Sequence, residues 1–357
     1  MSNPDIQARA SGALMGALIG EALAVGPHWY YDLDALRADY GSWISGYTEP
    51  KPGRYHAGLK AGESSQAGLL LELTMRSLRE RGGYDEADFC RRLDENFFPQ
   101  IDGTPNSGPG GYTSQSMRHT WRLRVREGQP WEQVGGYADT TEAAERALAI
   151  AVRYARKPAK LAKLVSDNTV LTQIDPTVGA MTTAYCAALG LLVQGEPFDK
   201  DISGKLMALV RSGELPFHTV TAEGESFVPN GAEQARRAGQ FASPDALLGM
   251  GSIARAAADP DVRIDPAWKV SLVYGMPCSV YHQFPAVYYL AARFAGDFET
   301  AVLNAVNGGG QNQARAMLTG ALVGAMVGIA GIPKRLVDGL DRAQERLQLA
   351  GAIAANV

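Results

Sequence analysis

Apolar residues recur along the chain at spacings of three and four residues, and sustained alternation of apolar and polar residues is hard to find. Such spacing places apolar side chains on one face of an α-helix, whereas a half-buried strand needs a period of two. The pattern therefore predicts an all-α protein. The predicted helices are Ile6–Val25, Ser65–Arg81, Thr141–Arg156, Thr177–Gln194, Pro244–Ala258, Phe284–Phe294, Glu299–Ala305, Gln311–Ile329 and Pro333–Leu349.

The helices are separated by loops rich in glycine and proline, notably residues 102–112 and 307–310. No low-complexity linker divides the 357 residues, and no repeat period stands out. A chain of this length can bury one large core or two smaller ones. Without a linker, the sequence predicts one large helical domain over residues 1–357.

Two of the predicted helices carry glycine at regular intervals. Gly12, Gly16 and Gly20 lie on neighbouring faces of the first, and the late one has glycine every four residues, at positions 320, 324 and 328. Glycine inside a helix costs up to about 1 kcal/mol relative to alanine, so the spacing needs a compensating gain. Close packing of two backbones supplies that gain, and we expect the two helices to form a buried central pair.

Composition narrows the class of protein. Hydrophobic residues make up 46% of the chain and charged residues 20%, which is typical of a soluble globular protein and excludes a disordered one. The net charge of -4 argues against a nucleic-acid partner, because a phosphate-binding surface needs clustered Lys and Arg. The most basic stretch, residues 118–126, is better explained as the solvated face of a helix.

Cysteine usage and the N-terminus indicate a cytoplasmic protein. Cys90, Cys186 and Cys278 are odd in number and far apart, which fits neither a disulfide framework nor a zinc site. The N-terminus shows no basic region ahead of an apolar one, so no secretion signal is expected. The longest uncharged stretch, residues 316–333, is shorter than the ~20 residues of a membrane span. We expect no membrane partner, and the sequence leaves the oligomeric state open.

Candidate chemistry gathers in four polar clusters at helix ends. They contain Glu21, His28, Trp29 and Tyr30; then Tyr55, His56, Glu63, Ser64 and Ser65; then the loop 102–112 with Tyr112; and finally Asn307, Gln311, Asn312 and Gln313. Each cluster also has an ordinary structural explanation. The two serines can cap a helix, the 307–310 segment can be a simple turn, His28 can belong to an aromatic core cluster, and neutral amides are commonly exposed.

Across nearly its whole length the chain resembles the ADP-ribosylglycohydrolase family. The matching segments are residues 12–23 (GALMGALIGEAL), 173–176 (QIDP), 284–290 (FPAVYYL), 297–301 (DFETA), 307–310 (NGGG), 319–325 (TGALVGA) and 328–333 (GIAGIP). The resemblance implies an all-α fold with two magnesium ions at the mouth of the central helices. It also implies hydrolysis of the glycosidic bond between ADP-ribose and a protein side chain.

The chain departs from the family where the resemblance places the metal ligands. The family's TDDTQM corresponds to residues 62–67 (GESSQA), and GGDTDT corresponds to residues 309–314 (GGQNQA). Where the family has an acidic residue after the first helix, this chain has His28. The family's Gly-Asp pair corresponds to Gly20-Glu21. Magnesium prefers carboxylate oxygens, and two ions held by Glu63 and neutral amides would repel each other almost uncompensated. We therefore expect no cofactor and no metal ligands.

Three functions remain open. The first is an enzyme that acts on a small molecule without metal, with Glu21, His28 or Glu63 as acid or base. The pocket residues would be Trp29, Tyr30, Tyr55, His56, Ser64, Ser65, Tyr112, Asn307, Gln311, Asn312 and Gln313. The second is an inactive protein that binds ADP-ribose or a related nucleotide. The third is a structural protein, comparable to the jellyfish crystallins that resemble this family. Acids and histidines at the pocket positions favour the enzyme, which predicts that Glu63, His28 and residues 311–313 converge and that Glu21 or Glu63 is shielded from water.

Overall fold

The computed structural model describes residues 3–217 and 245–357. Within these ranges the chain forms helices and no strands, with only two isolated bridges, Gly136 to Gln173 and Thr140 to Ser279. The α-helices are α1 Ile6–Val25, α2 Leu33–Tyr40, α3 Gln66–Arg81, α4 Glu86–Arg92, α5 Gln115–Trp121, α6 Glu142–Arg153, α7 Pro158–Val170, α8 Pro176–Val193, α9 Ile202–Arg211, α11 Asp245–Ala258, α12 Val270–Tyr274, α13 Val280–Arg293, α14 Phe298–Asn307, α15 Asn312–Val327, α16 Lys334–Asp338 and α17 Ala343–Ala354. The predicted all-α class is confirmed.

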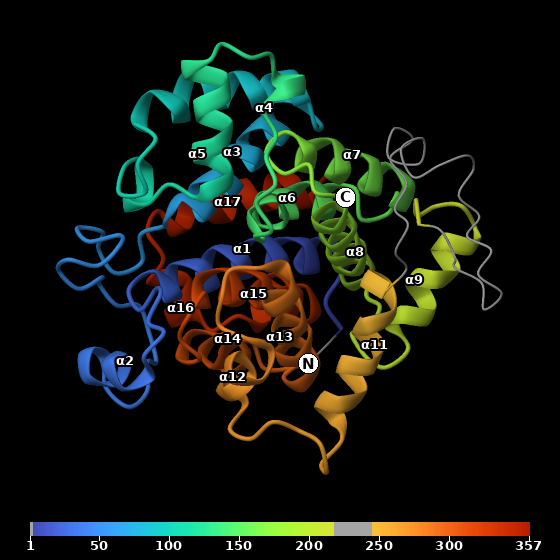
Figure 1. Cartoon of the computed structure of the whole chain (residues 1–357). Coiled ribbons are helices and arrows are strands. Elements are labelled where there is room, and N and C mark those ends of the chain that lie inside the picture. The colour runs from blue at the N-terminus through green and yellow to red at the C-terminus, as the bar shows by residue number, and fades with distance from the viewer. Residues whose placement is uncertain (1–2, 218–244) are drawn as a thin grey trace.

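Helices α1 and α15 form the centre of the molecule (Figure 1). They run antiparallel, and their glycines bring the backbones into direct contact. A Cβ placed on Gly16 would lie 2.2 Å from the carbonyl oxygen of Gly320, and one on Gly20 would lie 2.1 Å from that of Ala316. The predicted close pair of glycine-rich helices is therefore confirmed, and it fixes the ends of both helices relative to one another.

The other helices surround this pair. Helices α3, α6 and α17 pack on one side of α1, while α13 and α14 pack against α15, and α8 contacts both central helices (Figure 1). Two helices, Ile6–Val25 and Pro176–Val193, are long and apolar enough to cross a membrane by length and composition. Both are largely buried inside the protein, so they form its core here.

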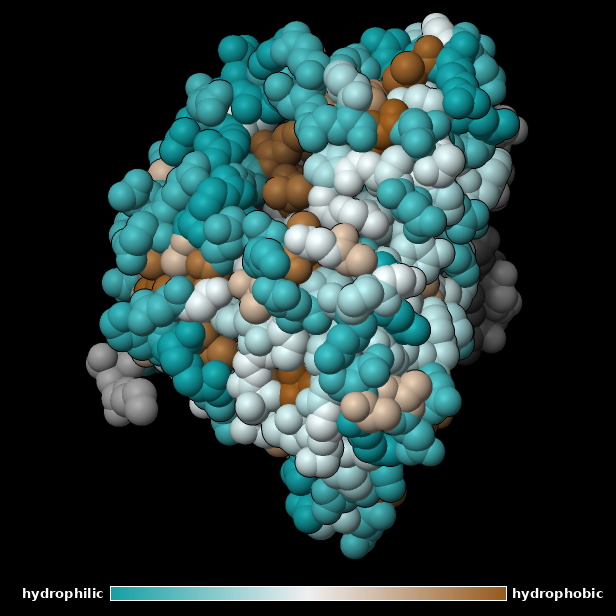
Figure 2. Space-filling view, turned by 90° about the vertical axis from the view of Figure 1, so that its left-hand side faces the viewer, coloured by the Kyte–Doolittle hydropathy of each residue, from teal (hydrophilic) through white to brown (hydrophobic). Residues whose placement is uncertain are grey.

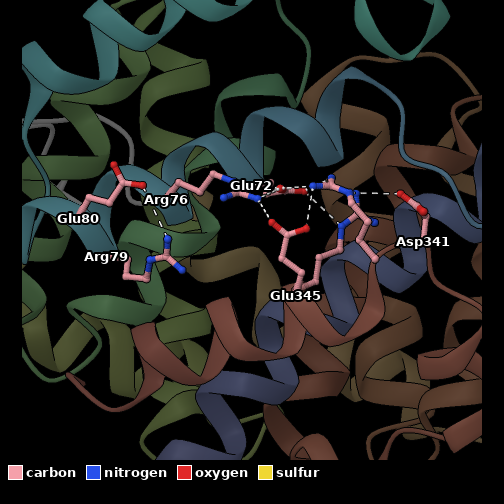
Figure 3. Close-up of polar contacts among 8 residues, drawn as sticks. Glu72, Arg76, Arg79, Glu80, Asp341 and Glu345 are labelled. Carbon is pink, nitrogen blue, oxygen red and sulfur yellow. Dashed lines mark hydrogen bonds and ion pairs between the residues drawn. The ribbon is translucent and has the colours of Figure 1, made fainter.

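An ion-pair cluster joins the C-terminal helix α17 to α3 (Figure 3). The buried carboxylate of Glu72 accepts hydrogen bonds from Arg76, from Arg342 at 2.6 Å and from Arg346 at 3.3 Å, and Arg76 and Arg342 also contact Glu345. Burial alone would raise the pKa of Glu72, but its hydrogen bonds from the arginines outweigh burial and lower it. The cluster holds the chain's last helix against the helix that begins at the candidate site.

Some helix boundaries differ from the sequence prediction. Helix α13 begins at Val280, four residues before the predicted start, because Ser279 caps it and Pro285 is accommodated inside. The predicted helix over residues 333–349 is instead two helices, α16 and α17. Between them Arg342 has a φ of +50° and the Asp341 amide donates to the Gly62 carbonyl at 2.9 Å. Pro244, where one helix was predicted to start, lies outside the described residues.

Several helices were not predicted at all. They are α2, α4, α5, α7, α9 and α12, of five to thirteen residues each. The basic stretch at residues 118–126 crosses the end of α5 and a π-helical turn, Arg122–Arg126. Arg122 and Arg126 are exposed there, which agrees with its interpretation as a solvated face.

Candidate active site

The site begins at the turn that follows α1. Trp29 in this turn has a φ of +59°, a conformation that a bulky residue rarely adopts. Two backbone hydrogen bonds hold the turn to the start of α15. The Trp29 amide donates to the Gly310 carbonyl at 3.1 Å, and the Gly310 amide donates to the Tyr30 carbonyl at 2.7 Å. These bonds place His28 directly beside Gln311.

A second loop brings His56 to the same place. His56 also has a positive φ, +65°, and its amide donates to the Gly111 carbonyl. A Cβ on Gly111 would lie 2.7 Å from the His56 Cα, so only glycine permits this approach. The strained backbone at both Trp29 and His56 is typical of a site where geometry is imposed by the surrounding fold.

The two histidines form a buried hydrogen-bonded chain. His56 Nδ1 lies 2.5 Å from the Gly110 carbonyl oxygen, His56 Nε2 lies 2.7 Å from His28 Nδ1, and His28 Nε2 lies 2.7 Å from the Gln311 amide. Burial lowers the pKa of His56 to about 4 and holds that of His28 well below its usual value. Both rings are therefore neutral at physiological pH.

Because both histidine rings are neutral, each ring nitrogen has a defined role as donor or acceptor in these hydrogen bonds. The carbonyl of Gly110 only accepts, so His56 carries its proton on Nδ1 and accepts at Nε2. His28 must then donate from Nδ1, which leaves its Nε2 as an acceptor. The Gln311 side chain lies with Oε1 toward this nitrogen, so the network is satisfied when the amide is turned to present its NH2 group, an assignment that follows from the hydrogen-bond pattern and not from the atom positions. The pair thus forms a fixed, uncharged wall.

A partly open cavity of about 340 Å³, here called the inner cavity, lies against this wall. His28, His56 and Gln311 line it together with side chains from α3, α6 and the 277–282 segment, including Ser65, Gln66, Ser114, Thr140, Ser279 and His282. A wider outer cleft of about 840 Å³ adjoins it and is lined by Tyr31, Arg54, Tyr55 and Asn106. Trp29, Tyr112 and Cys278 line both spaces, so they form the boundary between the inner cavity and the outer cleft.

Aromatic packing fixes this boundary. The ring of Trp29 stacks on His28 with centroids 4.0 Å apart, and Tyr112 meets Trp29 edge-on at 4.4 Å. Tyr55 packs edge-on against both Trp29 and Tyr112. The loops that carry these residues lie on the left of Figure 1, and Figure 2 shows that face: hydrophilic and neutral residues dominate it, with small separate hydrophobic patches.

The carboxylates of the inner cavity come from the start of α6. Glu145 is 3% exposed, and its Oε1 accepts from the Thr141 hydroxyl at 2.6 Å. Burial, together with neighbouring Glu142 and Glu21, raises its pKa to about 8, although the hydrogen bonds of Thr141 and Gln313 offset part of the shift. Burial likewise raises the pKa of Glu142, which accepts from the Ser116 hydroxyl. Glu145 therefore holds its proton at neutral pH, and the pKa of Glu142 is shifted in the same direction.

Glu21 lies behind the cavity rather than in its lining. It is fully buried, its Oε1 accepts from the Ser65 amide at 2.8 Å, and burial raises its pKa to about 7. A Cβ on Gly68 would lie 2.6 Å from Glu21 Oε2, so the glycine makes room for the carboxyl group. Glu21 thereby holds the start of α3 and the hydroxyl of Ser65 in place.

The structure brings together some of the predicted site residues. His28, Trp29, His56, Ser65, Tyr112, Gln311 and Gln313 line the inner cavity, and Tyr55 lines the outer cleft. Glu63 does not join them: it is only half-buried, and its Oε2 accepts from the Lys60 amide at 2.7 Å in a local turn. The expectation of one shielded glutamate is met by Glu21 instead.

Four other predicted residues are occupied elsewhere. Tyr30 donates to Asp39 and stacks under the Arg54 guanidinium. Asn307 bonds the backbone of Ile44 through both its amide atoms. Asn312 donates to the carbonyls of Pro27 and Val306, and Ser64 is buried but does not line the cavity. These residues support the site's walls.

Sequence reasoning missed Asp139, Glu142, Glu145, Cys278 and His282, all of which line the inner cavity. The available signal was the pair of glutamates three residues apart at the start of a helix. Acidic residues in a first helical turn usually reflect the helix dipole, so the pair gave no reason to suspect a cavity.

Comparison with known proteins decides the family. The ADP-ribosylglycohydrolase family profile matches residues 2–357. The chain belongs to the ADP-ribosylglycohydrolase family. A solved structure described as an "ADP-ribosylglycohydrolase-related protein complex" is similar to it, with 18% identity over 99% of each chain and a TM-score of 0.60, which supports the fold. No match was found among the curated proteins.

Within the family, the magnesium positions of this chain hold few charged donors. Across the described ranges, no group of three or more His, Cys, Asp or Glu side chains is arranged to hold a metal ion. At the two motif segments, Glu63 is the one carboxylate, and it faces Lys60. The remaining polar side chains of the two segments are the hydroxyls of Ser64 and Ser65 and the amides of Gln66 and residues 311–313.

Proposed function

We propose that this ADP-ribosylglycohydrolase family member is a hydrolase that acts on a small molecule in the inner cavity without magnesium. The observation that carries the proposal is the pair Glu142 and Glu145, two carboxyl groups that line the inner cavity and whose pKa values are raised. Acids whose pKa lies near the working pH are suited to proton transfer, and burial in a cleft is the usual means of raising it.

The donors at the motif segments support metal independence. Two magnesium ions need near-octahedral oxygen ligands and several carboxylates to offset their charge. The oxygens of Gln311 and Asn312 are neutral, although the Asn312 Oδ1 atom is buried without a partner in the described ranges, and Glu63, the one motif carboxylate, accepts from the Lys60 amide. These side chains do not fit a pair of magnesium ions, so we assign proton transfer in the reaction to the protein's own carboxyl groups.

Hydrolysis here needs a proton for the leaving group and an activated water. Glu145 is protonated at neutral pH and is suited to donate its proton to the leaving atom as the bond to it breaks. Glu142, which lines the same cavity, is suited in its ionised form to take a proton from the attacking water. The neutral histidine chain, with both His28 nitrogens engaged, orients substrate rather than transferring protons.

A substrate panel of small N- and O-glycosides, assayed with excess chelator, tests this proposal. We expect turnover to survive chelation and to fall by about 100-fold or more in Glu145→Gln, which keeps the side chain's shape but cannot donate an acidic proton. Activity of the wild-type protein should also fall as the pH rises above about 8, where Glu145 loses its proton.

Glu132→Gln is the matched control, because Glu132 is exposed and does not line the cavity. It should retain full activity. Turnover that disappears on chelation, or that is equal in Glu145→Gln and the wild-type protein, would refute the proposed mechanism. Absence of turnover across the panel, with ADP-ribose binding intact, would instead favour the inactive nucleotide-binding alternative.

A further inference from the structure

We propose that a second pocket of this protein binds a small molecule through a phosphate-type oxyanion. The pocket has a volume of about 570 Å³ and lies where the ends of α3 and α6 meet the starts of α4 and α7. We call it the basic pocket, because the charged residues that line it are Arg81, Asp85, Arg153, Lys157 and Lys160. The inference concerns a site separate from the inner cavity and does not depend on the proposed function.

Three of the four basic side chains in this pocket have no carboxylate partner. Arg81 pairs with Asp85, and its Nε lies 2.9 Å from Asp85 Oδ2. Lys157 and Lys160 form no ion pair with any residue in the described ranges, and the hydrogen bonds of Arg153 go only to backbone carbonyls. Cations gathered in one pocket repel each other, and here they do so in a chain whose net charge is -4. The arrangement therefore indicates an anionic ligand.

Tyr154 holds two of these charges against one ring. Arg153 Cζ lies 5.3 Å from the ring centroid, and Lys160 Nζ lies 4.8 Å from it. Tyr154 is 5% exposed, lines the pocket, and accepts from the Tyr84 amide at 2.9 Å through its hydroxyl oxygen. The proton of this hydroxyl has no acceptor within the part of the chain that the structure describes. An oxygen of the ligand would supply that acceptor.

The start of α7 adds backbone donors to the side-chain charges. Lys157 immediately precedes this helix, Pro158 opens it, and no side chain caps it. The Ala159 and Lys160 amides therefore have no partner within the helix. The positive end of the helix dipole thus lies beside the two lysines of the basic pocket, where it favours an anion.

The number of unpaired cations favours a ligand with more than one negative charge. A carboxylate carries one charge and two oxygens. A phosphate monoester carries about 1.5 to 2 negative charges at pH 7 and three acceptor oxygens. Three unpaired cations and the tyrosine hydroxyl match the second group better, and arginine and lysine are the side chains that usually bind phosphate. The volume of the pocket leaves room for the rest of a small phosphorylated molecule.

The basic pocket is remote from the candidate active site. Helices α3 and α6 both begin at the inner cavity, where Gln66 and Glu142 line it, and both end at the basic pocket with Arg81 and Arg153. Helix α3 has 16 residues and is therefore about 24 Å long. A ligand in the basic pocket would consequently touch none of the groups assigned to hydrolysis.

Titration calorimetry with pyrophosphate tests this assignment, with acetate as a singly charged comparison and with all solutions freed of divalent ions. We expect one pyrophosphate per chain, with a Kd below about 1 mM in about 50 mM NaCl. Acetate should bind at least about tenfold more weakly, because it offers a single charge to three cations. Raising NaCl to about 500 mM should weaken pyrophosphate binding at least about fivefold, since salt screens charges at a partly exposed site.

The double variant Lys157→Gln/Lys160→Gln should weaken pyrophosphate binding at least about tenfold. Both side chains are exposed, so we expect the variant to fold, and its Tm without ligand checks this. Lys269→Gln is the matched control. Lys269 is also exposed and also lies over an aromatic ring, that of Trp268, but it does not line the pocket. Its variant should bind pyrophosphate like the wild-type protein.

Three results would overturn the inference: no saturable binding of pyrophosphate, binding unchanged in the double variant, or an equal loss of binding in Lys269→Gln. A DNA duplex of about 20 base pairs, titrated at the same salt concentration, tests the alternative of a nucleic-acid surface. We expect the duplex to bind more weakly than pyrophosphate. Tighter binding of the duplex through the same two lysines would contradict the assignment of this pocket to a small molecule.

Discussion

At the scale of single residues, the site depends on carboxyl groups that the fold keeps away from water. Glu21 is the clearest case, because one of its oxygens accepts from the Ser65 amide while burial raises its pKa to about 7. The folded protein therefore binds a proton that the unfolded chain, with its ordinary glutamate pKa, releases at lower pH. The contribution of this proton to stability is present at acidic pH and is lost as the pH rises toward 7.

This reasoning predicts the behaviour of Glu21→Gln. Glutamine keeps an oxygen for the Ser65 amide but cannot ionise, so the variant avoids the cost of charging a buried group. We expect its free energy of unfolding to exceed that of the wild-type protein by up to about 3 kcal/mol above pH 7 and by little at pH 5. Denaturant unfolding across this pH range measures the difference. A gap that is constant with pH would contradict a buried carboxyl group titrating near 7.

The residues of the site were predictable in part. His28, Gln311 and Gln313 follow from the motif positions that the family resemblance marks, and Trp29 and His56 follow from the polar clusters at helix ends. Glu142 and Glu145 do not, since only the packing of α6 against the site shows that a first-turn glutamate faces a cavity. Glu63 occupies a motif position, but its side chain accepts a hydrogen bond from the Lys60 amide. The motif does not predict this local side-chain conformation.

At the scale of elements, the pattern of apolar residues predicts the long buried helices well. Helix α1 has the predicted bounds, because its Asp5 cap and its apolar run are both encoded locally. The break between α16 and α17 was not predictable from local signals. It depends on Asp341 reaching the Gly62 carbonyl, a contact between segments distant in the sequence.

The glycine contact of α1 and α15 gives a prediction at this scale. In Gly16→Ala, the new Cβ would lie 2.2 Å from a backbone oxygen of α15, so the two helices must move apart. We expect a loss of about 2 kcal/mol in the free energy of unfolding, despite alanine's better helix propensity. Thermal or denaturant unfolding measures it.

Gly204→Ala is the matched control for this experiment. Gly204 lies in α9 with no atom within 4 Å of its Cβ position, so the variant should gain up to about 1 kcal/mol. If the two substitutions changed stability by the same amount and in the same direction, close packing would not explain the glycines of α1.

At the scale of the whole molecule, the chain has the family fold, and most side chains in the segments where the resemblance places magnesium ligands are neutral. The central pair of helices still brings the first loop and the start of α15 together, as the bonds between Trp29, Tyr30 and Gly310 show. The proposal is that acids from α6 do the chemistry in this chain. The family resemblance predicted the architecture, whereas the positions of the acidic side chains in the inner cavity could be found only from the structure.

Magnesium titration of the wild-type protein tests this account most directly. Calorimetry, with thermal unfolding in parallel, measures binding by the intact site, and Glu63→Gln shows whether the remaining motif carboxylate takes part. The account predicts no submillimolar binding and no magnesium-dependent rise in Tm in either protein, because neutral amides and hydroxyls do not offset the charge of two ions. Submillimolar binding of two magnesium ions by the wild-type protein, with stabilisation to match, would contradict it.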